Sequence, residues 1–189
     1  IRFKLAELYG AIGSFDDALD NMAWILGDAS RVNWVDGQFA AARILQQAGE
    51  AADDAATANA LLTAAIVGRS DGPARFWGWG GLANRLSRKA VVPTGADEEA
   101  RKAAGQFFQA RLELARCRVA IAEKTPTGRD EAFAKAERDI TVTYRLYPEL
   151  GGREMRKAFD SLLKQIQKER GQPAAGLAAV EGVTVPQGT

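Results

Sequence analysis

The acidic residues of this sequence form clusters that could bind a metal ion or act in acid–base chemistry. The three clusters are Asp16-Asp17, Asp53-Asp54 and Asp97-Glu98-Glu99. Each cluster lies at the expected first turn of a helix, where the partial positive charge of the helix dipole stabilises carboxylates. We therefore predict that these acids begin helices and that they form neither a metal site nor a catalytic site.

Cys117 is the only cysteine, and the chain contains no histidine. The neighbouring Arg116 and Arg118 could lower the pKa of the thiol and make it a nucleophile. Without histidine, however, the chain lacks the commonest general base, the usual hydrolase triads and most zinc sites. We expect Cys117 to be a packed helical residue. The sequence predicts no catalytic residue, no metal and no cofactor, and therefore a protein that is not an enzyme.

The overall charge disfavours nucleic acid as a partner. Twenty-five Lys and Arg residues balance 24 Asp and Glu residues, which gives a formal charge of +1. Proteins that bind phosphate backbones usually have a strong basic excess. No membrane span is expected either, because the longest apolar run, residues 60–67, is far shorter than the roughly 18 residues that a span needs. Helical periodicity begins at Ile1, and we take the chain to be a mature or truncated piece.

Helical periodicity extends over most of the chain, and alternating strand patterns are scarce. Glycine or proline ends most of the periodic segments. We therefore predict an all-α domain over residues 1–170 with about eight helices and no sheet. The tail, residues 171–189, has no aromatic residue and one charge, and we expect it to be extended or mobile. The expected helices cover residues 1–12, 18–26, 39–48, 55–67, 73–89, 97–124, 129–147 and 153–170.

The stretch RFWGWGGLA, residues 75–83, holds two of the four tryptophans. A phosphate-binding loop would need the pattern G-x-x-x-x-G-K-[ST] after a strand, and this pattern is missing. An aromatic platform that stacks bases on Phe76, Trp77 and Trp79 is a second interpretation. We favour a third, the start of a helix in which Trp79 fills a gap between helices and Gly80-Gly81 allows close approach.

A two-residue pattern recurs along the chain: an apolar or small residue is followed directly by a small residue. Its copies are Leu5-Ala6-x-x-Tyr9, Ala41-Ala42-x-x-Leu45, Leu82-Ala83-x-x-Leu86 and Leu114-Ala115-x-x-Arg118, at intervals of 36, 41 and 32 residues. With Trp79 three positions before Leu82, the third copy resembles the first helix of a tetratricopeptide repeat, a unit of about 34 residues. Gly13-Ser14-Phe15 and Ala18 continue the resemblance at the N-terminus. Near the other end, Phe133, Ala136, Ile140, Thr143 and Pro148 resemble the second helix of such a repeat and its closing proline.

This resemblance implies a solenoid of antiparallel helix pairs that acts as a non-catalytic scaffold. Its partner would be a protein or peptide, or a second copy through self-assembly; the alternative is a helical-repeat protein that binds RNA. The family's clamp for a peptide carboxylate is not expected, because only Asn84 matches it and Gly80 and Leu112 stand at its lysine positions. The groove positions that the resemblance assigns are Arg43, Gln47, Trp77, Asn84, Arg88 and Arg116.

The sequence also predicts which residues pack in the core. Expected core residues are Leu5, Tyr9, Ala18, Trp79, Leu82, Ala83 and Ala136. We expect one long helix from about Asp97 to about Glu123, because the interior Gly105 costs only about 1 kcal/mol relative to alanine. Phe107 or Phe108 would then lie near a surface where a partner could dock.

Overall fold

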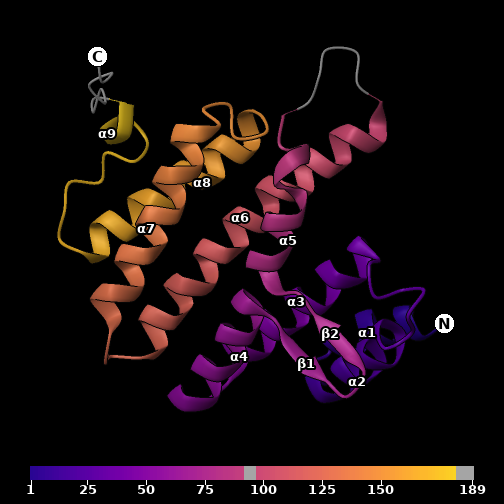
Figure 1. Ribbon diagram of the computed structural model, residues 1–189. Coiled ribbons are helices and arrows are strands. Elements are labelled where there is room, and N and C mark those ends of the chain that lie inside the picture. Colours follow the sequence, from indigo (N-terminus) through magenta and orange to yellow (C-terminus); the bar gives the residue numbers. More distant parts are fainter. Residues whose placement is uncertain (92–96, 182–189) are drawn as a thin grey trace.

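The computed structural model describes residues 1–91 and 97–181, and over these residues the fold is all-α apart from one short hairpin (Figure 1). The prediction that the fold is mostly α-helical is thereby confirmed. The strands are β1 (Arg69–Asp71) and β2 (Ala74–Phe76). The helices are α1 (Arg2–Ala11), α2 (Phe15–Leu26), α3 (Val35–Ala51), α4 (Ala55–Val67), α5 (Gly78–Leu86), the 3₁₀ turn η1 (Ser87–Lys89), α6 (Glu98–Lys124), α7 (Arg129–Leu146), α8 (Arg153–Glu169) and α9 (Ala178–Glu181).

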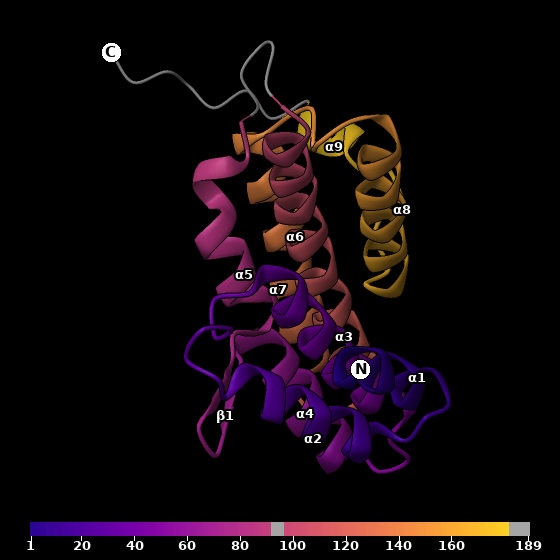
Figure 2. The same ribbon diagram turned by 90° about the vertical axis from the view of Figure 1, so that its right-hand side faces the viewer.

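Consecutive helices pack in pairs along the chain. Helix α1 packs on α2, and α3 packs on α4, while the long helix α6 contacts α4, α5, α7 and α8. Figure 1 shows α1–α4 at one end of the molecule, α7–α9 at the other and α6 between them. In the view of Figure 2 the axes of α5, α6 and α8 run in a similar direction. Helix α6 therefore connects the two ends of the fold.

The acidic clusters begin helices as predicted. Asp16 and Asp17 lie in the first turn of α2. The side chain of Asp54 accepts a hydrogen bond from the Thr57 amide at 2.8 Å, and Asp97 accepts one from Ala100 at 2.8 Å. The hydrogen bonds from Thr57 also lower the pKa of Asp54. These carboxylates satisfy amides that have no partner within the helix.

The predictions of a helix from residue 73 and of no sheet are wrong. Strands β1 and β2 pair antiparallel, with Arg69 opposite Phe76 and Asp71 opposite Ala74. The loop between them is the two-residue turn Gly72-Pro73, in which Gly72 has a φ of 53°. Glycine adopts this left-handed conformation without strain, and such turns are typical of hairpins. Helix α5 therefore begins only at Gly78.

A buried glutamine fixes the hairpin on α3. The Gln38 amide nitrogen donates hydrogen bonds to the carbonyl oxygens of Val32 at 2.9 Å and Arg75 at 2.8 Å. Its oxygen accepts a hydrogen bond from the Trp77 backbone amide at 2.9 Å. The side chain is fully buried. Gln38 thus supplies partners for backbone groups at the hairpin's end, which would otherwise be buried without any.

The stretch RFWGWGGLA contains the start of α5, as predicted. Trp79 is 1% exposed, and its ring packs edge-on against Phe39 with a centroid distance of 5.3 Å. Phe76 and Trp77 are also buried, at 2% and 7% exposure. The interpretation of these rings as a platform for bases is therefore wrong, because none of the three faces solvent.

Five of the seven predicted core residues are buried: Ala18, Trp79, Leu82, Ala83 and Ala136. Tyr9 is half-buried against the core. The prediction for Leu5 is wrong, because its side chain is 36% exposed. Leu5 lies on the outer face of α1, while the buried residues of that helix are Ala6 and Gly10.

Helix α6 is a single helix of 27 residues that continues through Gly105, as predicted. The expectation that Phe107 or Phe108 lies near a surface is wrong in part, since their exposures are 4% and 3%. Both rings pack edge-on against Tyr147, with centroid distances of 5.3 and 5.7 Å. Tyr147 follows α7 and covers the two phenylalanines.

The sequence suggests that a helix ends at Gly49, but the helix continues past this residue. Helix α3 continues to Ala51. A Cβ atom at position 49 would lie 2.7 Å from Leu62 Cγ and 3.0 Å from the Leu62 nitrogen. Gly49 therefore allows the backbones of α3 and α4 to approach closely, which is a packing role and not a helix stop.

The first part of the tail is folded, contrary to the expectation from composition. Leu177 is 3% exposed, and its backbone amide donates a hydrogen bond to Asp160 of α8 at 2.9 Å. The Gly176 amide donates to the side chain of Gln167 at 2.7 Å. Residues 182–189 of the expected tail and residues 92–96, which lie between two expected helices, are outside the described residues.

Gly49 and Gly105 both lie inside helices, and their surroundings predict opposite effects of substitution by alanine on stability. Gly49→Ala should lower the free energy of unfolding by about 1–3 kcal/mol, because the added methyl group overlaps Leu62. Gly105→Ala should raise it by about 0.5–1 kcal/mol, because nothing lies within 4 Å of the added Cβ and alanine favours the helix. Urea unfolding of both variants measures this difference. Destabilisation by Gly105→Ala, or neutrality of Gly49→Ala, would contradict the packing described.

Candidate functional site

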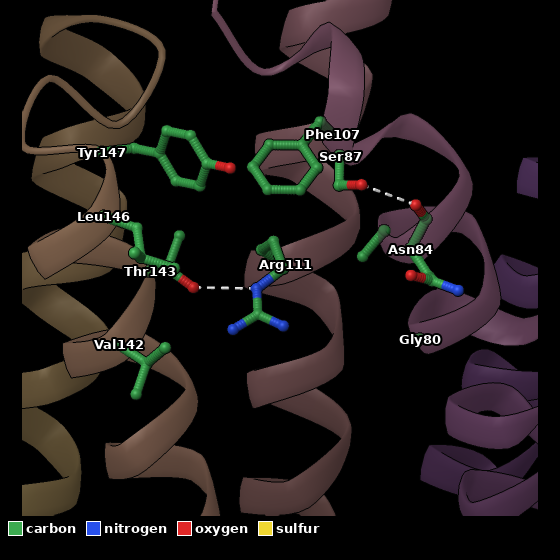
Figure 3. A pocket seen from close by; sticks show the side chains of 10 residues that line it. Gly80, Asn84, Ser87, Phe107, Arg111, Val142, Thr143, Leu146 and Tyr147 are labelled. Atoms are coloured by element: carbon green, nitrogen blue, oxygen red, sulfur yellow. Dashed lines mark hydrogen bonds between the residues drawn. The ribbon is translucent and has the colours of Figure 1, made fainter.

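A cavity of about 270 Å³ opens between α5, α6 and α7 (Figure 3). Helix α6 forms its floor, and the other two helices supply its sides. We call it the polar cavity, because amide, hydroxyl and guanidinium groups line it. Its lining residues are Gly80, Ala83, Asn84, Ser87, Phe107, Arg111, Val142, Thr143, Leu146 and Tyr147.

Arg111 of α6 is the charged residue of the polar cavity. Its Nε donates a hydrogen bond to Thr143 Oγ1 at 2.8 Å, and its Nη2 donates to the Asp139 carbonyl oxygen at 3.2 Å. Figure 3 shows Thr143 on one side of the guanidinium and Asn84 on the other. The two hydrogen bonds hold the guanidinium in a fixed orientation while the Nη1 edge has no hydrogen-bond partner among the described residues.

The carboxylate of Asp139, whose backbone carbonyl accepts a hydrogen bond from Arg111, is paired with another arginine. Asp139 forms an ion pair with Arg118 at 2.7 Å. Burial raises the pKa of Asp139, and the neighbouring Arg118 and Arg111 oppose that rise. Within the described part of the chain, Arg111 itself makes no ion pair. Its positive charge is therefore available to an anionic group that enters the polar cavity.

A second cavity, of about 640 Å³, lies beside the first and is mostly apolar. We call it the apolar cavity. It is lined by Ala90, Val91, Arg101, Ala104, Gly105, Phe108, Leu146, Tyr147, Pro148, Glu149, Leu150, Gly151 and Gly152. These residues come from the two positions after η1, the beginning of α6, the end of α7 and the loop that follows α7.

The loop after α7 owes its shape to two unusual residues. Leu150 has a φ of 48°, a left-handed conformation that is rare for leucine, and its side chain is fully buried. Gly151 has a φ of 77°, and a Cβ there would lie 2.5 Å from the ring of Phe108. Burial of Leu150 offsets the backbone strain and holds the loop against Phe108 as one wall of the apolar cavity.

Leu146 and Tyr147 line both cavities, so the two form one groove with a polar end and an apolar end. Leu146 is 66% exposed and Val142, one turn earlier on α7, is 37% exposed. These two side chains form an exposed apolar edge of the polar cavity. We refer to the joined cavities as the groove.

Of the six groove residues that the sequence assigns, one lines this groove. Asn84 lies on α5 beside Arg111, as Figure 3 shows. Arg88 is exposed on η1 outside the lining residues, and Trp77 is buried with the guanidinium of Arg85 stacked on its ring at 4.1 Å. Trp77 therefore has a packing role.

The other three assigned residues lie on α3 and on the far half of α6. Arg43 and Gln47 are exposed on α3. Arg116 forms an ion pair with Glu113 at 2.6 Å on the same helix. The structure thus does not bring these three together with Asn84 in one cavity.

The sequence did not assign to a groove the residues that α7 and the position after it contribute: Val142, Thr143, Leu146 and Tyr147. They are distant in sequence from Arg111, and no pattern links them to it. Arg111 itself had a signal, because it occupies the position of Trp79 in the fourth copy of the repeat pattern.

Cys117 is buried in α6, as expected for a packed residue. Burial raises the pKa of its thiol, and the negative charges of Glu113 and Glu50 raise it further. The possibility that Arg116 and Arg118 activate the thiol is therefore contradicted. Among residues 1–91 and 97–181, no three His, Cys, Asp or Glu side chains gather where they could hold a metal ion. Over the same residues, no helix combines the length and the apolar character needed to cross a membrane.

Comparison of the chain with models of protein families, with curated proteins and with solved structures gives no match.

The environment of Cys117 predicts an unreactive thiol. In the native protein at mildly alkaline pH, alkylation by iodoacetamide should be slower than in guanidinium chloride by about a hundredfold or more, because only the thiolate reacts. Mass spectrometry at successive times measures the difference. Rapid alkylation of the folded protein would show that the thiol is exposed or that the arginines activate it.

Proposed function

We propose that this domain is a non-catalytic scaffold that binds a peptide segment of another protein in the groove between α5, α6 and α7. The observation that carries the proposal is the pairing of a charged polar cavity with a larger apolar cavity across the shared residues Leu146 and Tyr147. Sites that recognise peptides combine pockets for side chains with a few fixed polar groups that set orientation.

The polar end supports recognition of an acidic group. The Arg111 guanidinium is oriented by Thr143 and the Asp139 carbonyl before any ligand arrives. A group that is already oriented loses little conformational entropy on binding, so more of the interaction energy contributes to affinity. Asn84 adds an amide at the side of the polar cavity, where it can donate to the same ligand or accept from it.

The apolar end supports recognition of a large aliphatic or aromatic side chain. Its volume, about 640 Å³, falls in the range of small-molecule pockets and exceeds what one side chain fills. Phe108 and Leu150 are buried beneath it and give it a rigid wall. A peptide that places an apolar side chain here and an acidic side chain near Arg111 would use both ends of the groove.

The resemblance of Leu5-Ala6-x-x-Tyr9 and its copies to tetratricopeptide repeats gives separate support, because that family acts through partner binding. RNA binding, the alternative function, is disfavoured because the aromatic residues on which bases would stack, Phe76, Trp77 and Trp79, are buried. A balanced charge of +1 also gives little attraction to phosphate backbones.

Selection of peptides from a random displayed library on the 189-residue chain tests this function. We expect selected peptides to carry an acidic residue and a large apolar residue. Leu146→Asp should weaken their binding by tenfold or more, because it places a charge in the wall that both cavities share. Arg111→Ala should weaken it by about tenfold, in line with the loss of a charge-assisted hydrogen bond. Fluorescence anisotropy with a labelled peptide measures these affinities.

The matched control is Arg75→Ala, which removes an exposed arginine on β2, outside the groove. The affinity of the Arg75→Ala variant for the selected peptides should equal that of the unchanged chain. Equal affinities for Leu146→Asp and Arg75→Ala would exclude the groove as the binding site. Tight binding of a generic single-stranded RNA at low salt, with a steep loss as salt rises, would support the RNA alternative instead.

A further inference from the structure

The first part of the tail is held on the surface of α7 and α8 by specific contacts. The Leu177 side chain is buried, and the Leu177 amide donates a hydrogen bond to Asp160 of α8 at 2.9 Å. Glu181 accepts hydrogen bonds from the Tyr144 hydroxyl of α7 at 2.5 Å and from Arg156 Nη2 of α8 at 2.6 Å. In Figure 2, α9, which ends at Glu181, lies beside the upper end of α8. We call the surface that holds this segment the tail socket, and its residues are Tyr144, Arg153, Arg156, Lys157, Asp160 and Gln167.

The tail fits the socket closely at Gly176. This residue is buried and has a φ of 64°, and its amide donates a hydrogen bond to Gln167 at 2.7 Å. A Cβ atom at position 176 would overlap Asp160 Oδ1 and lie 2.8 Å from Lys164 Cε. The socket therefore accepts a glycine followed by a leucine, with a glutamate four positions after the leucine.

The docked segment is connected to α8 by exposed chain. Residues 171–175 are all exposed. Among residues 177–181, only the Leu177 side chain is buried, while Val180 is half-buried and Glu181 is exposed. A segment held by few buried side chains opens locally without unfolding the elements beneath it. The tail can therefore leave the socket while α7 and α8 stay folded.

The socket has more positive charge than the tail neutralises. A cavity of about 400 Å³ lies beside the docked segment and is lined by Arg153, Arg156, Lys157, Asp160, Leu177, Ala178 and Glu181. Asp160 is paired with Lys164 at 2.7 Å. Within the described part of the chain, Arg153 and Lys157 form no ion pair. Glu181 is the only charged residue of the tail, so the tail offers one carboxylate to three cations.

A segment that follows the same glycine-leucine-glutamate spacing and continues with further acidic residues would satisfy this cavity better than the tail does. We propose that the tail socket is a second binding site, for an acidic, leucine-containing segment of another protein, and that the tail occupies the site until such a segment displaces it. A tethered segment competes at an effective concentration of about millimolar, so the partner needs its additional ion pairs. No residue of the groove lines the socket, and the proposal does not depend on peptide binding in the groove.

Gly176→Ala releases the tail without changing any residue of the socket, because the added methyl group overlaps Asp160. The matched control is Gly128→Ala, which also places alanine at a positive φ, 81°, but has nothing within 4 Å of the added Cβ. Hydrogen exchange at the Leu177 amide should be at least tenfold faster in Gly176→Ala than in Gly128→Ala. Equal exchange rates would overturn the proposal.

Fluorescence anisotropy with two labelled peptides tests binding to the full 189-residue chain. One peptide, QPAAGLAAVE, has the sequence of residues 172–181, and the acidic peptide, QPAAGLAAVEEE, adds two glutamates. The acidic peptide should bind the Gly176→Ala chain at least tenfold more tightly than the Gly128→Ala chain, in which the docked tail competes. On the Gly176→Ala chain it should bind about three- to tenfold more tightly than the shorter peptide, because exposed ion pairs are individually modest.

Second substitutions in the Gly176→Ala chain locate the bound peptide. Arg156→Ala should weaken binding of the acidic peptide by tenfold or more, whereas Leu146→Asp, which lies in the groove, should leave this binding unchanged. Equal effects of these two substitutions, or equal affinities of the Gly176→Ala and Gly128→Ala chains, would overturn the proposal. Equal affinities of the two peptides would also overturn it, as would a dimer of the unchanged chain that Gly176→Ala abolishes, because the occupant would then be the tail of a second copy.

Discussion

The side-chain amide of Gln46 holds three helices in one arrangement, and the positions of the other elements depend on it. Its oxygen accepts a hydrogen bond from the Trp79 indole of α5 at 2.8 Å. Its nitrogen donates to Glu50 of α3 at 2.9 Å and to Glu113 of α6 at 3.1 Å. Gln46 is only 7% exposed, so a lost partner would leave a buried polar group unsatisfied at a cost of about 1–3 kcal/mol. Sliding of α5 or α6 relative to α3 breaks at least one of these bonds.

The groove follows from this constraint. Positions 111 and 113 are separated by 200° around α6, so Arg111 lies on the face opposite Glu113. When Glu113 binds Gln46 of α3, Arg111 necessarily faces α7, where Thr143 and the Asp139 carbonyl accept its hydrogen bonds. Trp79 fixes α5 in the same way, and Asn84 of that helix then lies beside Arg111. The contact that organises the core thus also sets the residues that line the proposed binding site.

The sequence predicts the features that depend on local periodicity and misses those that depend on distant contacts. One continuous α6 was predictable because a single Gly105 costs too little to break a long helix. The hairpin was not, because three-residue strands show no clear alternation and the Gln38 side chain that holds them is 37 positions from Arg75. The exposed Leu5 was mistaken for core, since the pattern shows an apolar face without showing what covers it. The α7 side of the groove was missed for a similar reason: Tyr147 covers Phe107 and Phe108 only in the folded chain.

The most direct test of this account is a double-mutant cycle between Trp79 and Gln46, measured as the free energy of unfolding in urea. Trp79→Phe keeps an aromatic ring and removes the indole donor, while Gln46→Leu removes the acceptor and keeps a similar volume. We expect a coupling energy of about 1 kcal/mol or more between the two sites, because each single variant leaves one end of this hydrogen bond buried without a partner and the double variant removes both ends. The hydrogen bonds from Gln46 to Glu50 and Glu113 are lost in both Gln46→Leu backgrounds, so their loss cancels in the cycle. Additive effects, within about 0.3–0.5 kcal/mol, would contradict the claim that this hydrogen bond joins α3 and α5.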